Sequence, residues 1–161
     1  MPFFDVKISS VKSGQTITGT TDLYTSNGAP AGAKEIKYLL LDSNTAKGFV
    51  VAGGTDLTKS YEWIPAMEDN GPKILVSAFY DAQGKFLAGD SIPVTVKINP
   101  QIKLNGITEG QLITADKVPL SATLNFSASY VKYEMINPDN DAQYYISPGV
   151  DPELTFNMIP V

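Results

Sequence analysis

The chain repeats itself, and this repetition constrains its fold more than any other feature of the sequence. Residues 6–18 read VKISSVKSGQTIT and residues 102–114 read IKLNGITEGQLIT, with five of the thirteen positions identical. Two further matches follow in the same order: IKYLLLD (36–42) with VKYEMIN (131–137), and DLTKSYEWIP (56–65) with DPELTFNMIP (151–160). The offset is 96 residues at the first match and 95 at the other two. A near-constant offset of this length predicts a duplicated module the size of a small domain.

The two copies differ in length. The first module spans residues 1–98, whereas the second spans residues 100–161 and stops one residue after Pro160, the counterpart of Pro65. The short junction at Asn99-Pro100 predicts a semi-rigid connection, because proline favours an extended backbone and supplies no amide donor.

The second copy lacks counterparts of residues 72–81 and 90–98. We expect this to leave Val131, Tyr133 and Met135 poorly covered and to leave a strand edge open. Either the sequence is cut from a longer chain, or another molecule completes the second module, for example through strand-swapped self-association of residues 100–161.

Short β-forming runs alternate with Gly, Pro, Asn and Asp, and no long helical periodicity is present. Copy one is predicted to hold seven strands, near residues 4–12, 15–24, 34–42, 47–53, 58–64, 72–81 and 90–98. This spacing predicts an all-β fold made of tandem immunoglobulin-like antiparallel β-sandwiches, the second one incomplete.

Alternation within the predicted strands indicates which side chains are buried. The expected core residues are Ile36, Tyr38, Leu40, Tyr61, Trp63, Leu75 and Phe79. Residues 74–81 are apolar on both faces, which favours a central strand over a packing surface for a neighbouring module.

Composition excludes several classes of function. The chain carries 12 Lys and Arg against 17 Asp and Glu, a net charge of −5, which disfavours binding to nucleic acid or to an anionic membrane. It has no cysteine and no histidine, so disulfides, thiolate chemistry and histidine-based catalysis or metal binding are excluded. No apolar stretch is long enough to span a membrane, and the start MPFFDV is not a signal peptide.

Copy one contains the segments VKISSVKSGQTITG, EIKYLLLD, SYEWIP, NGPKILVSAFYDAQG and IPVTVKI. Together these segments resemble the bacterial Ig-like domains attached to cell-surface and cell-wall enzymes of Gram-positive bacteria, although Ser77 and Phe79 stand where the family usually carries small Ala residues. The resemblance implies an extracellular or cell-wall location beside an amidase or glucosaminidase domain. It also implies a non-catalytic spacer without cofactors, whose partners are neighbouring modules or a catalytic domain of the same protein.

Binding of cell-wall polysaccharide is the alternative function. β-Sandwiches can bind glycans through exposed aromatic rings, and in an extended segment one of the adjacent Tyr144 and Tyr145 should face outward. Tyr24 and Phe49 are further candidates, although aromatic residues of a small domain more often fill its core.

Acidic residues offer two weaker hypotheses. The carboxylate pairs Glu68 with Asp69, Asp81 with Asp90, and Asp139 with Asp141 are candidates for acid–base catalysis. The segment NPDNDAQ (137–143) could supply calcium ligands, but it lacks the glycine and the distal glutamate of an EF-hand loop. Both groups lie in turn-like sequence, where Asp and Asn commonly bond to nearby backbone instead.

Overall fold

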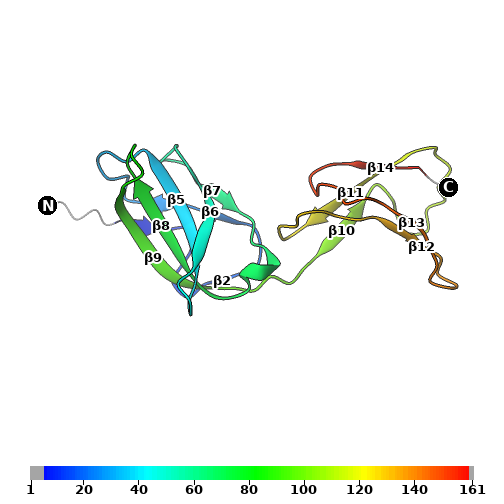
Figure 1. Ribbon diagram of the computed structural model, residues 1–161, viewed down its shortest axis with the longest axis horizontal. Helices are drawn as coiled ribbons and strands as arrows, with labels where there is room; N and C mark the ends of the chain where they lie inside the picture. The colour runs from blue at the N-terminus through cyan, green and yellow to red at the C-terminus, as the bar shows by residue number, and fades with distance from the viewer. Residues whose placement is uncertain (1–5, 160–161) are drawn as a thin grey trace. The chain divides into compact units, whose positions relative to one another are not determined.

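A computed structural model describes residues 6–159 of the chain, apart from the side chains of residues 144–146. The chain divides into two compact units, Met1–Asn99 and Pro100–Val161 (Figure 1). In the described residues the regular structure consists of strands and one 3-10 turn, Met67–Asp69. The prediction of an all-β fold is therefore confirmed.

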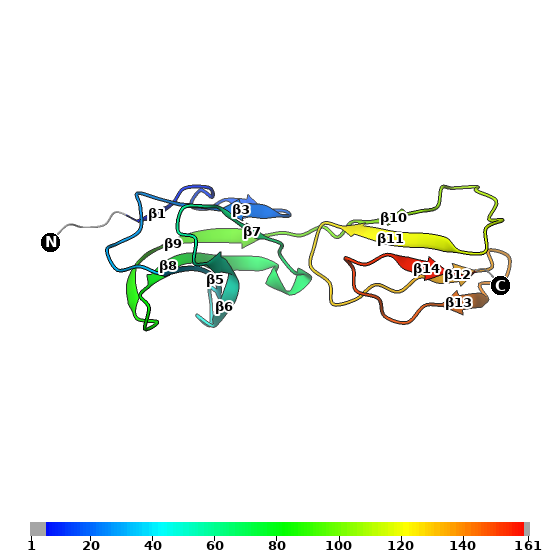
Figure 2. The ribbon, with the colours of Figure 1, turned by 90° about the horizontal axis from the view of Figure 1, so that it is seen from above.

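Unit one is a sandwich of two layers, which Figure 2 shows edge-on. Its strands are β1 (Lys7–Ile8), β2 (Thr16–Ile17), β3 (Thr21–Leu23), β4 (Thr25–Ser26), β5 (Glu35–Asp42), β6 (Gly48–Gly54), β7 (Tyr61–Trp63), β8 (Gly71–Tyr80) and β9 (Phe86–Val96). One layer is a five-stranded sheet in the order β2-β9-β8-β5-β6, and the pairs β1-β4 and β3-β7 form the other.

Strand β8 lies in the middle of the larger sheet. It pairs antiparallel with β5 on one side, from Glu35↔Tyr80 to Asp42↔Lys73, and with β9 on the other. Leu75 and Phe79 are fully buried on its inner face, with 0% exposure, and Ala78 on the opposite face is 2% exposed. Ile74, Val76 and Tyr80 on that face are half-buried, so β8 is the central strand that the sequence predicts, with an outer face that is only partly covered.

The predicted core of unit one is buried with one exception. Trp63 is 2% exposed, and Ile36, Tyr38 and Leu40 of β5 are between 0% and 2% exposed. Tyr61 is only half-buried, which corrects the prediction. Its hydroxyl donates to the Asp56 carbonyl at 2.9 Å and accepts from the Asp56 amide at 3.2 Å, which holds the ring at the edge of the core.

One predicted strand is divided between the two layers. Residues 15–24 form β2, which pairs with β9, and β3, which pairs with β7, so the chain changes sheets at residues 18–20. The β2-β9 pairing is parallel, a departure from the antiparallel pattern that the sequence predicts. Residues 4 and 5 of the first predicted strand lie outside the described residues.

Tyr38 carries a polar group into the core of unit one. Its hydroxyl and that of Thr25 are 2.9 Å apart and share a hydrogen bond between the two layers. Burial raises the pKa of the Tyr38 phenol above its ordinary value of 10.0, with the hydrogen bond to Thr25 acting in the opposite direction. The neutral phenol is therefore the form that the folded unit favours.

We expect unit one to lose stability at high pH through Tyr38. Because the folded pKa lies above the unfolded value of 10.0, the contribution is complete below that pH and is lost as the pH rises through the folded pKa. Urea unfolding monitored by Trp63 fluorescence between neutral pH and pH ~11 measures this loss. Tyr38→Phe should flatten the pH dependence, at a cost near neutral pH of about 1–3 kcal/mol for the unpaired Thr25 hydroxyl. An unchanged slope in the variant would contradict the assignment.

Unit two repeats the strand pairings of unit one. Its strands are β10 (Ile102–Asn105), β11 (Val118–Leu124), β12 (Glu134–Ile136), β13 (Gln143–Ile146) and β14 (Phe156–Met158). The pairs β10-β11, β11-β14 and β12-β13 correspond to β1-β4, β3-β7 and β5-β6 of unit one. The register is kept at one end of this pair, where Ile136 pairs with Gln143 as Leu41 pairs with Gly48, and a bulge shifts it by one residue at Met135. The sequence repeat is therefore also a structural repeat.

The described part of unit two contains no counterparts of β8 and β9. Strand β12 pairs with β13 alone, whereas β5 of unit one pairs with both β6 and β8. One edge of β12 is consequently left without a neighbouring strand.

Among the described residues of the whole chain, no helix is long and apolar enough to cross a membrane.

Candidate functional site

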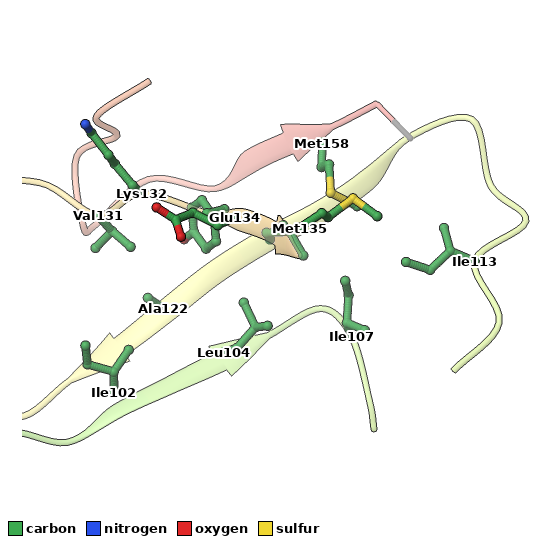
Figure 3. A pocket seen from close by; sticks show the side chains of 12 residues that line it. Ile102, Leu104, Ile107, Ile113, Ala122, Val131, Lys132, Glu134, Met135 and Met158 are labelled. Atoms are coloured by element: carbon green, nitrogen blue, oxygen red, sulfur yellow. The ribbon is translucent and has the colours of Figure 1, made fainter. Parts of the chain in front are cut away.

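An apolar groove lies in unit two, where strands β8 and β9 lie in unit one. It has a volume of about 260 Å³, and apolar side chains from β10, β11, β12 and β14 and from residues 106–117 line most of it. Figure 3 shows Leu104, Ile107 and Met135 around this space. Lys132 and Glu134 also line the groove, and both are exposed residues.

Equivalent positions in the two repeats show why the groove is open. Val6 and Ile8 of unit one are 5% and 7% exposed. Their counterparts Ile102 and Leu104, 96 residues further along, are 66% and 49% exposed. The residue types are alike, so the difference comes from what covers them. In unit one this includes β9, whose Asp90 carboxylate accepts the Ile8 amide at 3.0 Å.

The floor of the groove is a small closed core. Leu120, Tyr133 and Met158 are 3%, 8% and 2% exposed, and the Tyr133 ring stacks on Phe156 with ring centres 5.7 Å apart. Burial raises the pKa of the Tyr133 phenol. The Tyr133 amide donates to the Ser147 hydroxyl at 2.8 Å, which ties β12 to the following segment.

This core corrects part of the sequence prediction. Tyr133, expected to be poorly covered, is buried because Phe156 lies flat against it. Val131 and Met135 are half-buried and line the groove, as an incomplete second module implies. Two exposed apolar residues of the groove lining, Ile102 and Leu104, were not predicted. The match between residues 6–18 and 102–114 could have revealed them, because it pairs them with Val6 and Ile8 of the copy that has the two additional strands.

The groove can bind apolar side chains and main-chain groups. An apolar side chain that enters the groove is removed from water together with the lining it covers. This burial contributes about 25 cal/mol of favourable free energy per Å² of apolar surface. The free edge of β12 offers backbone donors and acceptors to an extended segment.

The candidate glycan-binding residues remain a prediction. Tyr144 and Tyr145 lie in β13, and their side chains are outside the described residues. Tyr24 and Phe49, in unit one, are 40% and 55% exposed, so neither fills the core. They lie on different elements, before β4 and on β6 respectively.

Three of the six candidate catalytic carboxylates accept hydrogen bonds from the backbone. Asp69 accepts the Ala66 amide at 2.8 Å in the 3-10 turn, and Asp81 accepts the amides of Gln83 and Lys85 at 2.9 and 2.8 Å. Asp90 accepts the Ile8 amide. Each of these bonds fixes a turn or joins two strands.

The candidate calcium loop is a turn held by asparagine side chains. Asn137 accepts the Asp139 amide at 2.9 Å, and Asn140 accepts the Ala142 amide at 3.0 Å. Asp141 has φ of 56°, a left-handed conformation typical of Asp and Asn in turns. Between residues 6 and 159, no group of three or more acidic side chains comes together as a metal site would require.

Comparisons with known proteins give only distant likenesses. No family model matches the chain, and no curated protein matches it. Fibronectin(III)-like modules of CbhA from Clostridium thermocellum are 14% identical, with 57% of this chain and 98% of that chain covered and a TM-score of 0.39. A marsupial T cell receptor is 13% identical, with 99% of this chain and 62% of that chain covered and a TM-score of 0.39. The fold assignment rests on the strand pairings described above.

Proposed function

We propose that this chain is a non-catalytic structural spacer built of tandem repeats. The observation that carries the proposal is that, in unit one, the polypeptide enters at one end of the strands and leaves at the other. Such a unit adds length between whatever is attached before it and after it.

In unit one, β9 spans the distance between these two points. Its residue Asp90 binds the Ile8 amide of β1, near the start of the unit, and β9 ends six residues later at Val96. At about 3.3 Å per residue, the chain leaves roughly 20 Å from where it entered. Figure 2 shows β1 at one end of unit one and the segment after β9 at the other.

In unit two, β10 and β14 pair with opposite ends of β11. Ile102 of β10, near the start of the unit, pairs with Leu124, whereas Met158 of β14 pairs with Val118. These partners are the two ends of the strand, six residue steps apart, or about 20 Å at the usual strand rise.

The bonds between β2 and β9 suit unit one to carrying tension. Their backbone bonds join Gly14 to Pro93 at 2.7 Å, Gln15 to Thr95 at 3.0 Å, and Ile17 to Lys97 at 2.8 Å. Because the two strands run parallel, pulling on the two ends of the unit shears all three bonds together instead of opening them one by one.

The resemblance to bacterial Ig-like domains supports a setting for this role. We place the spacer in a secreted or wall-associated bacterial protein, where it would position a catalytic or adhesive partner domain. A distance-setting module needs a stable core and in-line connections, and no reactive group.

Single-molecule pulling on the whole chain tests the load-bearing role. We expect unit one to unfold as one discrete event, and Thr95→Pro to lower its unfolding force because proline removes the amide that binds Gln15. Thr95→Ala, which keeps the amide at this exposed position, is the matched control. Equal unfolding forces for the two variants would contradict the shear arrangement.

A pull-down on purified peptidoglycan tests whether the chain is only a spacer. The proposal expects no retention of the whole chain. Retention that Tyr144→Ala or Tyr145→Ala abolishes would overturn it in favour of a glycan-binding module.

A further inference from the structure

We propose that the groove of unit two is a docking surface for an antiparallel pair of β-strands, supplied by a polypeptide segment other than residues 6–159. The occupant has the chemistry of β8 and β9: apolar side chains at alternate positions, facing the groove. Its first strand pairs with the free edge of β12, and its second covers β10.

In unit one, strand β8 covers the surface equivalent to part of the groove. In β5, Ile36 and Leu40 pair across from Phe79 and Leu75 of β8, and all four are buried. The counterparts of Ile36 and Leu40 in unit two are Val131 and Met135, both of which line the groove. An incoming strand with apolar residues four positions apart would meet them in the same register.

Strand β10 is exposed where the equivalent segment of unit one is buried. Ile102 and Leu104 stand where Val6 and Ile8 of unit one lie buried beneath the larger sheet. A single strand added to β12 would leave β10 uncovered, because in unit one it is β9 whose Asp90 binds β1. The groove therefore requires two strands, and an acceptor side chain on the second could bind the Leu104 amide as Asp90 binds that of Ile8.

Two other occupants fit the groove less well. A second copy of this chain has no free strand pair to give, because its own β8 and β9 are the centre of its first unit and bury Leu75 and Phe79. A compact apolar molecule would fill the groove but would leave the backbone edge of β12 unpaired, a lasting cost where water is excluded.

Extension of the whole chain provides the test. A copy of residues 67–98 is appended after Val161, the counterpart of Ala66, so that it follows β14 at the point where the original follows β7. The tether makes docking intramolecular and hence independent of weak affinity.

We expect amide hydrogen exchange at Lys132, Glu134 and Ile136 to slow by at least about tenfold, because these amides face the free edge and gain strand partners. The amides of Val131 and Tyr133, which alternate with them, already bond within the unit. Binding of a hydrophobic dye should fall as the groove is covered.

The matched control carries Leu75→Asp and Phe79→Asp in the appended copy only. This extension has the same length but cannot enter an apolar groove, so exchange at residues 131–136 should remain that of the parent chain. Equal exchange with both extensions would overturn the proposal.

A second variant tests the role of β10. Ile102→Lys should leave hydrogen exchange at residues 131–136 of the parent chain unchanged, because Ile102 is 66% exposed there. In the extended chain it should remove most of the gained protection, since the lysine would be covered. An extended chain that keeps its full protection with Ile102→Lys would contradict the two-stranded occupant. Dimerisation of the parent chain, with slowed exchange at residues 131–136, would identify a second copy as the occupant instead.

Discussion

Trp63→Ala is expected to lower the free energy of unfolding of unit one by about 3–5 kcal/mol, the range for large aromatic deletions in a packed core. Trp63 is 2% exposed and lies on β7, where it pairs with Thr21 of β3. Removing the indole leaves a cavity between the two layers that neighbouring strands, fixed by their pairing, cannot fill. Urea unfolding followed by circular dichroism measures the loss, since the variant has no tryptophan.

The neighbouring residue provides the control for this experiment. Ile64 follows Trp63 directly, has 43% exposure and points away from the core. Ile64→Ala should change stability by no more than about 0.5 kcal/mol. A midpoint for Trp63→Ala equal to that of the wild type would show that the tryptophan does not support the core.

Gly106→Ala is expected to destabilise unit two by about 3 kcal/mol or more, through two effects that add. Gly106 has φ of +98°, where an L side chain costs roughly 1–2 kcal/mol. A methyl group there would also overlap the carbonyl oxygen of Pro119 on the adjacent strand. Because that atom belongs to the backbone, β11 must shift to relieve the overlap. Hydrogen exchange at residues 118–124 in the whole chain measures the result.

Gly110 separates the two effects. Its φ of +75° is comparable, but a methyl group built on it meets nothing within 4 Å. Gly110→Ala should therefore cost only the conformational term, about 1 kcal/mol. If the two variants lose the same stability, the close approach of Gly106 to β11 does not matter.

Local patterns were sufficient to predict much of unit one. Alternation along residues 36–40 placed Ile36, Tyr38 and Leu40 on one face, and all three are buried. This succeeds because side chains of a strand alternate between faces whatever the strand pairs with. The same reasoning was wrong for Tyr61. Alternation indicates on which face of the sheet a ring lies, but not how close the ring is to the edge of the sheet.

The candidate site was predictable only in part. The repeat predicted an uncovered surface in the second module, and Val131 and Met135 do line the groove. It missed Ile102 and Leu104, whose exposure depends on contacts with strands distant in the sequence. The repeat also predicted that Tyr133 would be poorly covered, although Phe156 from β14 stacks on it. A packing partner that lies 23 residues away cannot be read from alternation alone.

The sequence by itself determined the all-β class and the duplication. It also determined that the groove of unit two and the equivalent core positions of unit one carry similar apolar residues. Only the tertiary structure decided where the chain changes sheets, that β2 joins β9 in parallel, and which apolar residues of the second repeat remain exposed. The physical reason is that alternation and turns are local properties of the backbone. Burial depends on what lies across the sandwich. Val6 and Ile102 occupy the same place in the repeat, yet only Val6 is covered.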